Sequence, residues 1–396
     1  MAKRIAIPSK ELQLTIVGPR DSFKASRVQR LSMNTDIPVE SKDELGNPKH
    51  IGDSKDTPNI TLTFQAFDVG IKTFAALTGR DSAAFPAGGV DISQLGEIDA
   101  IIYVKDTDVS DYVKSAHARK LQVRDFTFNY SVDGDSTEEY NAIGSERRWF
   151  KHDVVVDKFT TGTTSFTLSQ TPIQLLNGNF GLSVILDGKY LTEVSAAPAA
   201  GQYRIVGTTL TTGDSRTAQA LAVYHANPSG TNWADIADST MPVAIRGKDV
   251  AIKISTNDVA RVQSVNINGN LNTQPVKELG QRHVVGYQRQ VPTVEGTISV
   301  LDTDTDLISL LTTGTVGSGI EWMPGEGCAD VALSLKIELL DPCDDTATPD
   351  VIKTVYIPTI SIVGDAYTSN VNNNATQNFN FRSTDAQCLI YSGAMA

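Results

Sequence analysis

The residues that could carry chemistry are few and scattered along the chain. Zinc sites and disulfide frameworks need cysteines or histidines at short, regular spacings, and this sequence has no C-x-x-C pair. We therefore expect no metal and no cofactor, histidines that are satisfied on the surface or in loops, and cysteines that pack as small buried apolar side chains. The residues concerned are His50, His117, His152, His225, His283, Cys328, Cys343 and Cys388.

One acidic cluster comes closer to a metal site. Asp302, Asp304 and Asp306 have the spacing that opens a calcium-binding EF-hand loop. Such a loop needs glycine at its sixth position and glutamate at its twelfth, where this chain has Leu307 and Thr313. An acidic first turn of a helix explains the cluster better, because the helix dipole favours negative charge there.

Motifs of nucleotide-binding and hydrolytic enzymes are also missing. Residues 314–319 are rich in glycine, but no Lys-Ser/Thr pair follows them as in a phosphate-binding loop. Neither G-x-S-x-G nor H-E-x-x-H occurs, and Glu138 and Glu139 are expected in a solvated turn. The sequence favours a protein that is not an enzyme.

Composition sets the class of the protein. The chain has 396 residues, of which 40% are hydrophobic and 20% charged, with a net charge of −12. These values fit a folded chain of two or three domains, and the acidic balance argues against binding nucleic acid through its phosphates. No apolar run approaches the ~20 residues of a membrane-spanning helix, and residues 5–7 are too short for a signal peptide core. We expect a soluble protein that folds in a cytoplasm.

The strongest pattern is an internal repeat at a separation of 234 residues. Over positions 27–78, 13 of 52 residues are identical to those 234 positions later. Further along, the apolar residues Leu121, Val123, Phe126 and Phe128 fall opposite Val355, Ile357, Ile360 and Ile362 at the same separation. The repeat predicts two copies of one domain, copy 1 at residues 1–150 and copy 2 at 246–396, with an insert at 151–245.

Each copy is predicted to consist of strands, one short helix and further strands. Residues 60–66 alternate apolar and polar side chains, as do residues 122–130, which indicates strands with one buried face. Between them, residues 71–77 have helical spacing, with Asp68 as the expected N-cap and Gly79 as the C-terminal stop. Copy 2 repeats this order, with a helix expected at residues 304–311 and a stop at Gly314.

The insert is all-β in character. A strand, an Asp187-Gly188 turn and a second strand are predicted over residues 183–190. Residues 203–210 and 221–224 supply two further strands, and residues 228–230 are typical of a linker. The expected fold is therefore mainly β: two tandem β-sandwich or barrel domains, each with one short helix, and an inserted small all-β domain.

Two polar loops of about 20 residues, 38–57 and 272–291, hold the candidate contact residues. Loops of this length without a core of their own are usually functional. Each carries an apolar residue at its middle, which is expected to plug into a neighbouring subunit; the alternative is a flexible hairpin tip. The six residues are Glu44, Leu45, Gly46, Glu278, Leu279 and Gly280.

The order of these short motifs, occurring twice, resembles the major tail tube protein of long-tailed bacteriophages. The motifs cover residues 27–33, 44–46, 58–67 and 68–77 in copy 1, and residues 261–267, 278–280, 292–300 and 304–311 in copy 2. The resemblance implies strands that close into a barrel around duplex DNA, and stacked rings. For a chain with two copies, it implies trimeric, pseudo-hexameric rings whose loops reach the adjacent ring.

The resemblance also implies partners and a location. The chain would assemble with itself and with the terminator, baseplate or tip, and tape-measure proteins, in the host cytoplasm, and would reside in the virion tail without a membrane. An acidic lumen would let genomic double-stranded DNA slide past without specific binding. The insert would project outward as decoration, or alternatively bridge the two copies.

Other classes are open at this point. The chain could be another tail ring or hub component, or the inner tube of a contractile tail. An immunoglobulin-like surface adhesin would need export and would bind glycans. A carbohydrate-active enzyme would need paired acids such as Asp133 and Asp135, or Asp302 and Asp304, ~5–10 Å apart across a cleft.

Overall fold

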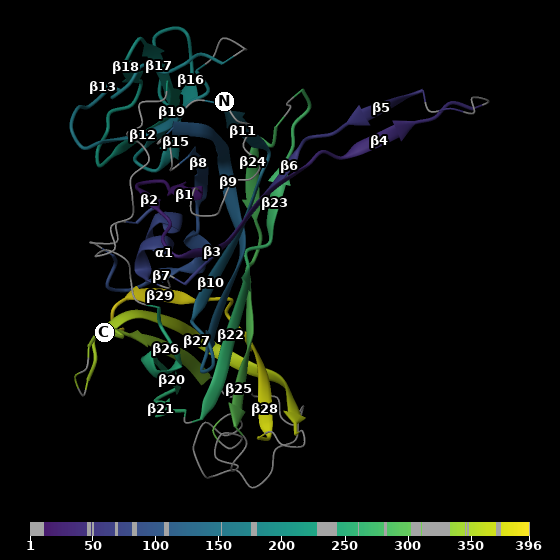
Figure 1. Cartoon of the computed structure of the whole chain (residues 1–396), viewed down its shortest axis with the longest axis vertical. Coiled ribbons are helices and arrows are strands. Elements are labelled where there is room, and N and C mark those ends of the chain that lie inside the picture. Colours follow the sequence, from purple (N-terminus) through teal and green to yellow (C-terminus); the bar gives the residue numbers. More distant parts are fainter. Residues whose placement is uncertain are drawn as a thin grey trace.

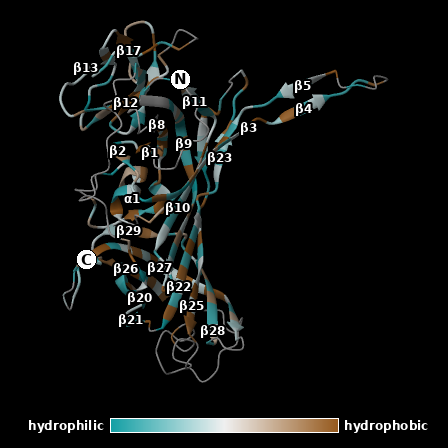
Figure 2. Cartoon of the chain, viewed as in Figure 1, coloured by the Kyte–Doolittle hydropathy of each residue, from teal (hydrophilic) through white to brown (hydrophobic). Residues whose placement is uncertain are grey.

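The structure is a computed structural model, and it confirms a mainly β protein (Figure 1). The residues it describes are 12–45, 49, 51–67, 70–80, 85–106, 111–151, 153–175, 180–227, 244–259, 261–280, 283–301, 310, 333–344, 346, 348–369 and 374–395; for 105–106 and 111–113 only the backbone is described. Apolar residues recur along the strands of the body (Figure 2).

Copy 1 contains two sheets that share one long strand, β9 (Asp111–Ser131). The front sheet has the order β3 (Val28–Asp36), β6 (Asn59–Ala66), β10 (Thr137–Gly144) and the second half of β9. The back sheet joins the first half of β9 to β8 (Glu97–Asp106), β1 (Leu12–Val17) and β2 (Ser22–Lys24). On its other edge, the same half of β9 pairs with β11 (Glu146–Phe150).

The alternation in the sequence sets which face of the front sheet is buried. Phe64 on β6 and Phe126 and Phe128 on β9 are buried in the core, as their spacing predicted. The residues between them, such as Thr63 and Thr127, lie on the opposite face.

Copy 2 has the same strand order. Its front sheet is β22 (Val262–Asn270), β25 (Thr293–Leu301), β28 (Thr376–Ser383) and the second half of β27 (Val351–Thr368). Its back sheet joins β27 to β26 (Leu333–Leu340), β20 (Val250–Ile254) and β21 (Asn257–Asp258). A further strand, β29 (Leu389–Ser392), pairs with the first half of β27, as β11 does with β9.

The 234-residue repeat extends to individual backbone and side-chain contacts. Arg27 and Arg261 both have positive φ, of 52° and 64°. Immediately after them the pairing of β3 with β6 is interrupted at Gln29, and that of β22 with β25 at Gln263. Each glutamine side chain donates to the carbonyl of the arginine two residues earlier, at 3.2 and 3.3 Å. The same β-bulge is therefore built twice.

The separation changes after β25, and one sequence-based alignment was wrong. The pairing of β9 with β8 has a β-bulge between Ala118 and Leu121, and the pairing of β27 with β26 has the same bulge between Ile357 and Ile360. Leu121 therefore corresponds to Ile360, at a separation of 239, and not to Val355. The stretch between β26 and β27, residues 341–350, is longer than that between β8 and β9, residues 107–110, and this length difference shifts the later strands.

The helix α1 (Ile71–Thr78) packs Phe74 and Leu77 into the core of copy 1. It ends at Gly79, which has φ of 66°, as predicted. Its N-cap is Gly70 rather than the expected Asp68, which lies outside the described residues. Of the helix expected in copy 2, only Leu310 is described, and it is helical and buried.

The insert is a small β domain with its own core. One of its sheets has the order β12 (Asp153–Phe159), β19 (Ala220–Ala226), β14 (Ser183–Leu186) and β15 (Lys189–Tyr190); the other has β13 (Ser165–Thr167), β18 (Thr209–Thr212), β17 (Gln202–Val206) and β16 (Thr192–Glu193). The Asp187-Gly188 turn is confirmed, with positive φ at both residues. The single strand predicted over residues 203–210 was wrong, because Gly207 has positive φ and turns the chain into a hairpin.

The insert rests on the back sheet of copy 1. Ile101 and Tyr103 of β8 form one apolar cluster with Val154, Ile185 and Val223 of the insert. Tyr103 also donates from its hydroxyl to the carbonyl of Val154 at 2.5 Å. In the part of the chain that is described, no helix is long and apolar enough to cross a membrane.

Candidate assembly interface

The junction between the two copies is a continuous β-sheet. Residues 125–131 of β9 pair antiparallel with residues 264–270 of β22, so the two front sheets merge into one of eight strands (Figure 1). At its centre Ile267 faces Phe128, and both are fully buried. Gly269 faces Phe126, and a Cβ at Gly269 would lie 2.0 Å from that ring, so this close approach requires glycine.

A second strand pair links the copies at the back. Leu389 and Ile390 of β29 pair with Asp91 and Val90 of β7 (Val90–Asp91). Cys388 is part of this link, because its amide donates to Asp91 Oδ2 at 3.2 Å and its carbonyl accepts from Ile92 at 3.0 Å. Cys388 is buried, as expected, and burial raises the pKa of its thiol. Cys343 is exposed, contrary to expectation.

Between these two links lies a buried ion pair. Lys353 Nζ on β27 of copy 2 contacts Glu138 Oε1 on β10 of copy 1. Tyr140 donates to the other carboxylate oxygen at 2.8 Å, and burial followed by the charge of Glu138 raises the pKa of Tyr140. The predicted solvated turn at Glu138 was therefore wrong. The alternation of β10 turns Glu138 inward, and Lys353 compensates its charge.

The two polar loops form two-stranded ribbons with the same register. Arm 1 consists of β4 (Val39–Lys42) and β5 (Gly52–Lys55), and arm 2 of β23 (Thr273–Val276) and β24 (Gly286–Arg289). Val39 faces Lys55 in arm 1, and the corresponding Thr273 faces Arg289 in arm 2. Both hairpins therefore preserve the separation of 234.

Of the six candidate contact residues, the structure places the five that it describes toward the tips of these arms. Leu45 and Leu279 are fully exposed, and Glu44 and Glu278 beside them are exposed as well. Gly280 has φ of 85°, which suits a glycine, and Gly46 lies outside the described residues. The two sets lie on different arms, so they form no joint site within one chain.

Arm 2 is seated on copy 1. At its base, the amide of Leu271 donates to the carbonyl of Arg124 at 2.8 Å. Further out, the amide of Val284 donates to Ser145 Oγ at 3.0 Å, and His283 Nδ1 lies 3.1 Å from the carbonyl oxygen of Ser145. Burial, together with the charge of Glu97, raises the pKa of Tyr287 on β24 to about 12.

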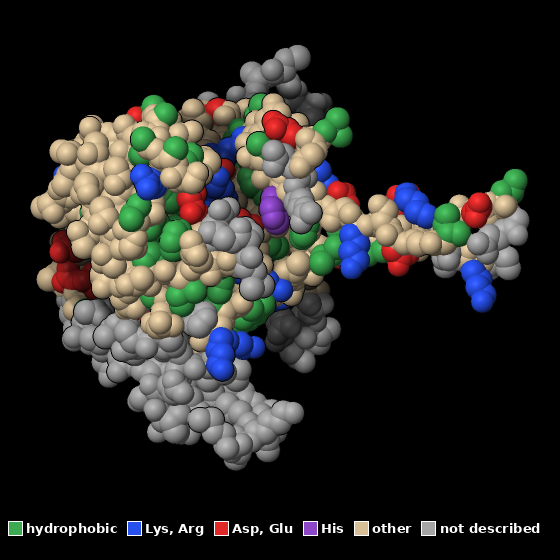
Figure 3. All heavy atoms as spheres, turned by 90° about the horizontal axis from the view of Figure 1, so that it is seen from above, with side chains coloured by type: hydrophobic (Ala, Val, Ile, Leu, Met, Phe, Trp, Pro, Cys, Tyr) green, Lys and Arg blue, Asp and Glu red, His purple; other side chains and the backbone are tan. Residues whose placement is uncertain are grey.

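Arm 1 projects away from the body (Figure 1 and Figure 3). Residues at the base of arm 1 are exposed where the equivalent residues of arm 2 are covered by copy 1. Ile37 is 45% exposed, whereas the equivalent Leu271 is 1% exposed. Val39 is exposed, and the equivalent Thr273 is buried. Of the described residues of the arm, Asp56 forms an ion pair at 2.8 Å with Lys277 of arm 2, and the hydrogen bond from Lys277 lowers the pKa of Asp56.

Among the described residues, each outer strand of the eight-stranded front sheet pairs on one side only. At one end is β3, which pairs on one side with β6. At the other is the second half of β27, which pairs on one side with β28 and carries the exposed apolar residues Val363 and Tyr367. Exposed apolar edges of this length are templates for pairing with another chain.

The outward face of the front sheet is polar and largely uncharged. Cross-strand pairs on it include Thr63 with Asn141 and Thr297 with Asn380, and in both pairs the threonine hydroxyl donates to the asparagine side-chain oxygen. From the alternation of the described strands, and from the ion pair of the bulge residue Arg124 with Asp125, the charged side chains on this face are Arg30, Asp36, Arg124, Asp125, Glu139, Glu295 and Arg382. Four acidic and three basic groups thus lie among many Ser, Thr and Asn side chains.

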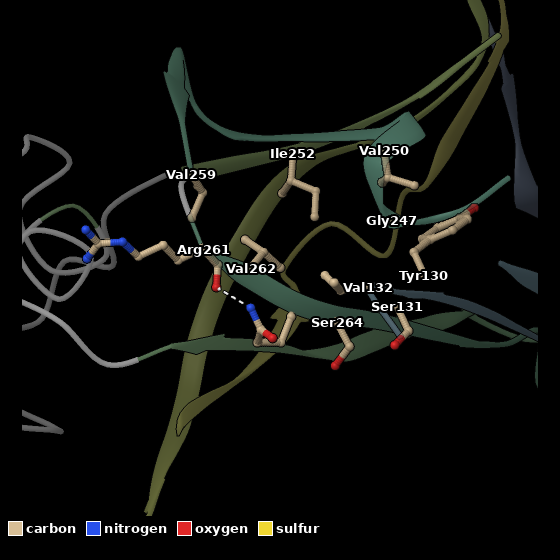
Figure 4. A pocket seen from close by; sticks show the side chains of 11 residues that line it. Tyr130, Ser131, Val132, Gly247, Val250, Ile252, Val259, Arg261, Val262 and Ser264 are labelled. Atoms are coloured by element: carbon tan, nitrogen blue, oxygen red, sulfur yellow. Dashed lines mark hydrogen bonds between the residues drawn. The ribbon is translucent and has the colours of Figure 1, made fainter. Parts of the chain in front are cut away.

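A cavity of about 190 Å³ lies beside the junction (Figure 4). Its lining includes Tyr130, Val250, Ile252, Val259 and Val262, and the side chain of Arg261 extends away from it (Figure 4). Its described lining holds no carboxylate, histidine or cysteine. This cavity therefore lacks the acid and base groups of a hydrolytic site.

Two of the described histidines, His117 on β9 and His225 on β19, are buried on strands, contrary to the expected surface or loop positions. The Nε2 atom of His117 lies 2.9 Å from Asp99 Oδ2. The other carboxylate oxygen of Asp99, Oδ1, accepts hydrogen bonds from the backbone amide of Lys120 and the hydroxyl of Tyr190. Burial alone would raise the pKa of Asp99, but the hydrogen bond with His117 and the charges of His117 and Arg119 lower it to about 2. Within the described ranges, no three His, Cys, Asp or Glu side chains gather as metal ligands. Asp302, Asp304, Asp306, His50, His152 and Cys328 lie outside those ranges.

Sequence reasoning missed the residues that join the copies. Glu138, Lys353, Gly269 and Ser145 carry no motif, and the repeat itself does not indicate which strands meet. A comparison with models of protein families finds no match, and a comparison with curated protein sequences finds none either. Function is therefore inferred from the geometry of the chain.

Proposed function

We propose that this chain is a structural virion protein that self-assembles into stacked trimeric, pseudo-hexameric rings, and that these rings form the tail tube of a long-tailed bacteriophage. The tube conducts double-stranded DNA into the host, and the protein has no catalytic role. The observation that carries the proposal is the junction of β9 with β22. It joins two repeated domains head to tail, and at the two ends of the front sheet it leaves β3 and β27 with one partner strand each among the described residues.

Head-to-tail contacts that repeat by rotation close into a ring. Three chains with two copies each supply six domains, and three eight-stranded front sheets give a barrel of 24 strands. At about 4.8 Å between strands and a tilt of about 40°, such a barrel has a diameter of about 50 Å. This leaves an aqueous channel wider than that of a porin, with room for duplex DNA.

The polar face of the front sheet suits the wall of a DNA channel. Lysine and arginine side chains that neutralise phosphates hold DNA in place. This face has three arginines against four acidic groups, and one of the arginines, Arg124, is already paired with Asp125. The remaining Ser, Thr and Asn side chains keep the wall hydrated. A weakly acidic lumen lets the genome slide past without specific binding.

The arms suit contacts between rings. Leu45 and Leu279 are apolar, fully exposed and carried on narrow ribbons, so each can insert into a neighbouring ring. The end rings of such a tube would meet the terminator and the baseplate or tip proteins, and the lumen would hold the tape measure before the DNA. The insert, on the back sheet of copy 1, would then lie on the outside of the tube.

The proposal is tested by expressing the chain alone and following its assembly. Sedimentation at increasing protein concentration is expected to show trimers and larger particles, and negative-stain electron microscopy is expected to show hollow rings or tubes. Monomers at every concentration and salt would contradict self-assembly. Copy number in a virion separates a tube protein, present many times, from a terminator or hub.

A further inference from the structure

We propose that two chains join by pairing β3 of one chain with the second half of β27 of the next, in the register that β22 and β9 show inside the chain. The inference rests on the proposed function, and it names the residues that meet between chains. Its basis is the internal junction, because β3 repeats β22 at a separation of 234 and β27 repeats β9 at a separation of 239.

These two separations fix the register. Inside the chain, Asn266 faces Asn129 and Ile267 faces Phe128. The equivalent residues place Ser32 opposite Thr368 of the next chain and Met33 opposite Tyr367. A strand shifted by one residue would turn its apolar side chains to the wrong face, so the register is a specific claim.

Burial supports this pairing. Phe128 is fully buried at the internal junction, whereas the equivalent Tyr367 is 60% exposed in the single chain. Ile267 is buried and the equivalent Met33 is only half-buried. The apolar side chains exposed on β3 and β27 are thus equivalent to side chains buried at the internal junction, as expected for an interface that is unoccupied in the single chain. A second copy of this chain supplies the strand that fits.

If the junction between chains repeats the internal junction, arm 1 lies on the next chain as arm 2 lies on copy 1. Arm 2 binds the hydroxyl of Ser145, and the residue equivalent to Ser145 in copy 2 is Thr384, which is exposed and also carries a hydroxyl. The exposed Ile37 would occupy the place of the buried Leu271, against the backbone of Val363. Arm 1 thereby gains the support that arm 2 receives within its own chain.

One difference separates the two junctions. The internal ion pair of Lys353 with Glu138 has Lys114 and Gln377 as its equivalents. The strand that carries Gln377 must be stable in the free chain before a partner arrives. Because Gln377 is an amide and not a carboxylate, the free chain holds no buried acid without a counter-charge at this position. Before assembly, Lys114 lies 4.6 Å from the ring centroid of Trp149, and Gln377 Nε2 donates to Asp365 at 3.1 Å.

Disulfide cross-linking tests the register. The chain is prepared with Cys328 and Cys343 replaced by serine, and Ser32→Cys is combined with Thr368→Cys. Facing residues of an antiparallel pair have Cα atoms about 4.5–5.5 Å apart, within disulfide range, whereas a shift by two residues exceeds it. Ser32→Cys with Ala366→Cys is the shifted control, and Asn129→Cys with Asn266→Cys is the equivalent pair inside one chain.

We expect mild oxidation to link the Ser32/Thr368 variant into covalent dimers and trimers on non-reducing gels, at least tenfold more than the shifted control. Met33→Cys with Tyr367→Cys covers the other class of facing pair, in case the first geometry is unfavourable. Assembled rings in which neither matched pair cross-links, or in which the shifted pair cross-links better, would overturn the register and leave the ring standing. Unsubstituted chains that stay monomeric would overturn both proposals.

Discussion

Lys353 of copy 2 contacts the carboxylate of Glu138 of copy 1 in the interior of the molecule, where Lys353 is 0% and Glu138 1% exposed. The lysine Nζ also lies 5.1 Å from the ring centroid of Phe128, the residue that faces Ile267 in the sheet junction. The ion pair, the contact of the lysine with the Phe128 ring and the pairing of Phe128 with Ile267 are therefore adjacent, and together they hold the two copies in a fixed orientation.

Removing one partner of this pair is expected to be costly. Lys353→Met leaves Glu138 buried without its counter-charge, which should lower the free energy of unfolding by about 3–5 kcal/mol. The double variant Lys353→Met/Glu138→Gln should recover most of that loss. Urea denaturation of the monomer measures both, with Lys114→Met as the matched control on the equivalent residue. Equal losses for the single and double variants would show that packing, and not charge, dominates.

The close approach at Gly269 gives a second prediction. Gly269→Val places new atoms against the Phe126 ring, and such overpacking usually costs about 1–3 kcal/mol. Thr35 occupies the equivalent position on the exposed edge strand β3, so Thr35→Val should leave the stability of the single chain unchanged within about 0.5 kcal/mol. Thermal unfolding of both variants checks the pair. A stable Gly269→Val variant would argue against the β9–β22 register.

Acid is expected to weaken the seat of the insert. Asp99 has a pKa of about 2 in the folded chain, below its ordinary 3.8. Its charge therefore stabilises the fold above about pH 4, and roughly 2 kcal/mol is lost as the pH falls from 4 to 2. Asp99→Asn should flatten this part of the stability curve, and Asp133→Asn in an exposed turn should not. Identical curves for the wild type and Asp99→Asn would contradict the assignment.

Removing the arms separates folding from polymerisation. Deletion of residues 40–50 and 274–284 together removes the exposed tips with Leu45 and Leu279 and leaves the core clusters untouched. We expect folded trimers or monomers that do not polymerise, seen by circular dichroism and electron microscopy. The point variants Leu45→Asp and Leu279→Asp test the leucines alone. Tubes of normal length from the deletion variant would show that the arms do not join rings.

Much of the fold was predictable because it follows from local periodicity. The alternation around Phe64 and Phe126 correctly placed two strands and their buried faces, and Gly79 correctly marked the end of the helix. The Asp187-Gly188 turn was equally local.

The errors arose where a tertiary partner decides the outcome. Glu138 looks solvated until Lys353, 215 residues later, is placed beside it. The residue equivalent to Leu121 was misplaced because a longer connection shifts β27 by five positions. Arm 1 projects from the body and arm 2 lies on copy 1, although the two hairpins have the same register. The difference therefore comes from the surfaces beside them and not from the pairing within each hairpin.

The most direct test of the account is the rotational symmetry of the assembled particle, measured from end-on class averages in electron microscopy. We predict three-fold symmetry, six inner lobes that alternate between copy 1 and copy 2, and an open central channel. Six-fold particles containing six chains, closed discs without a channel, or chains that never form rings would contradict the account.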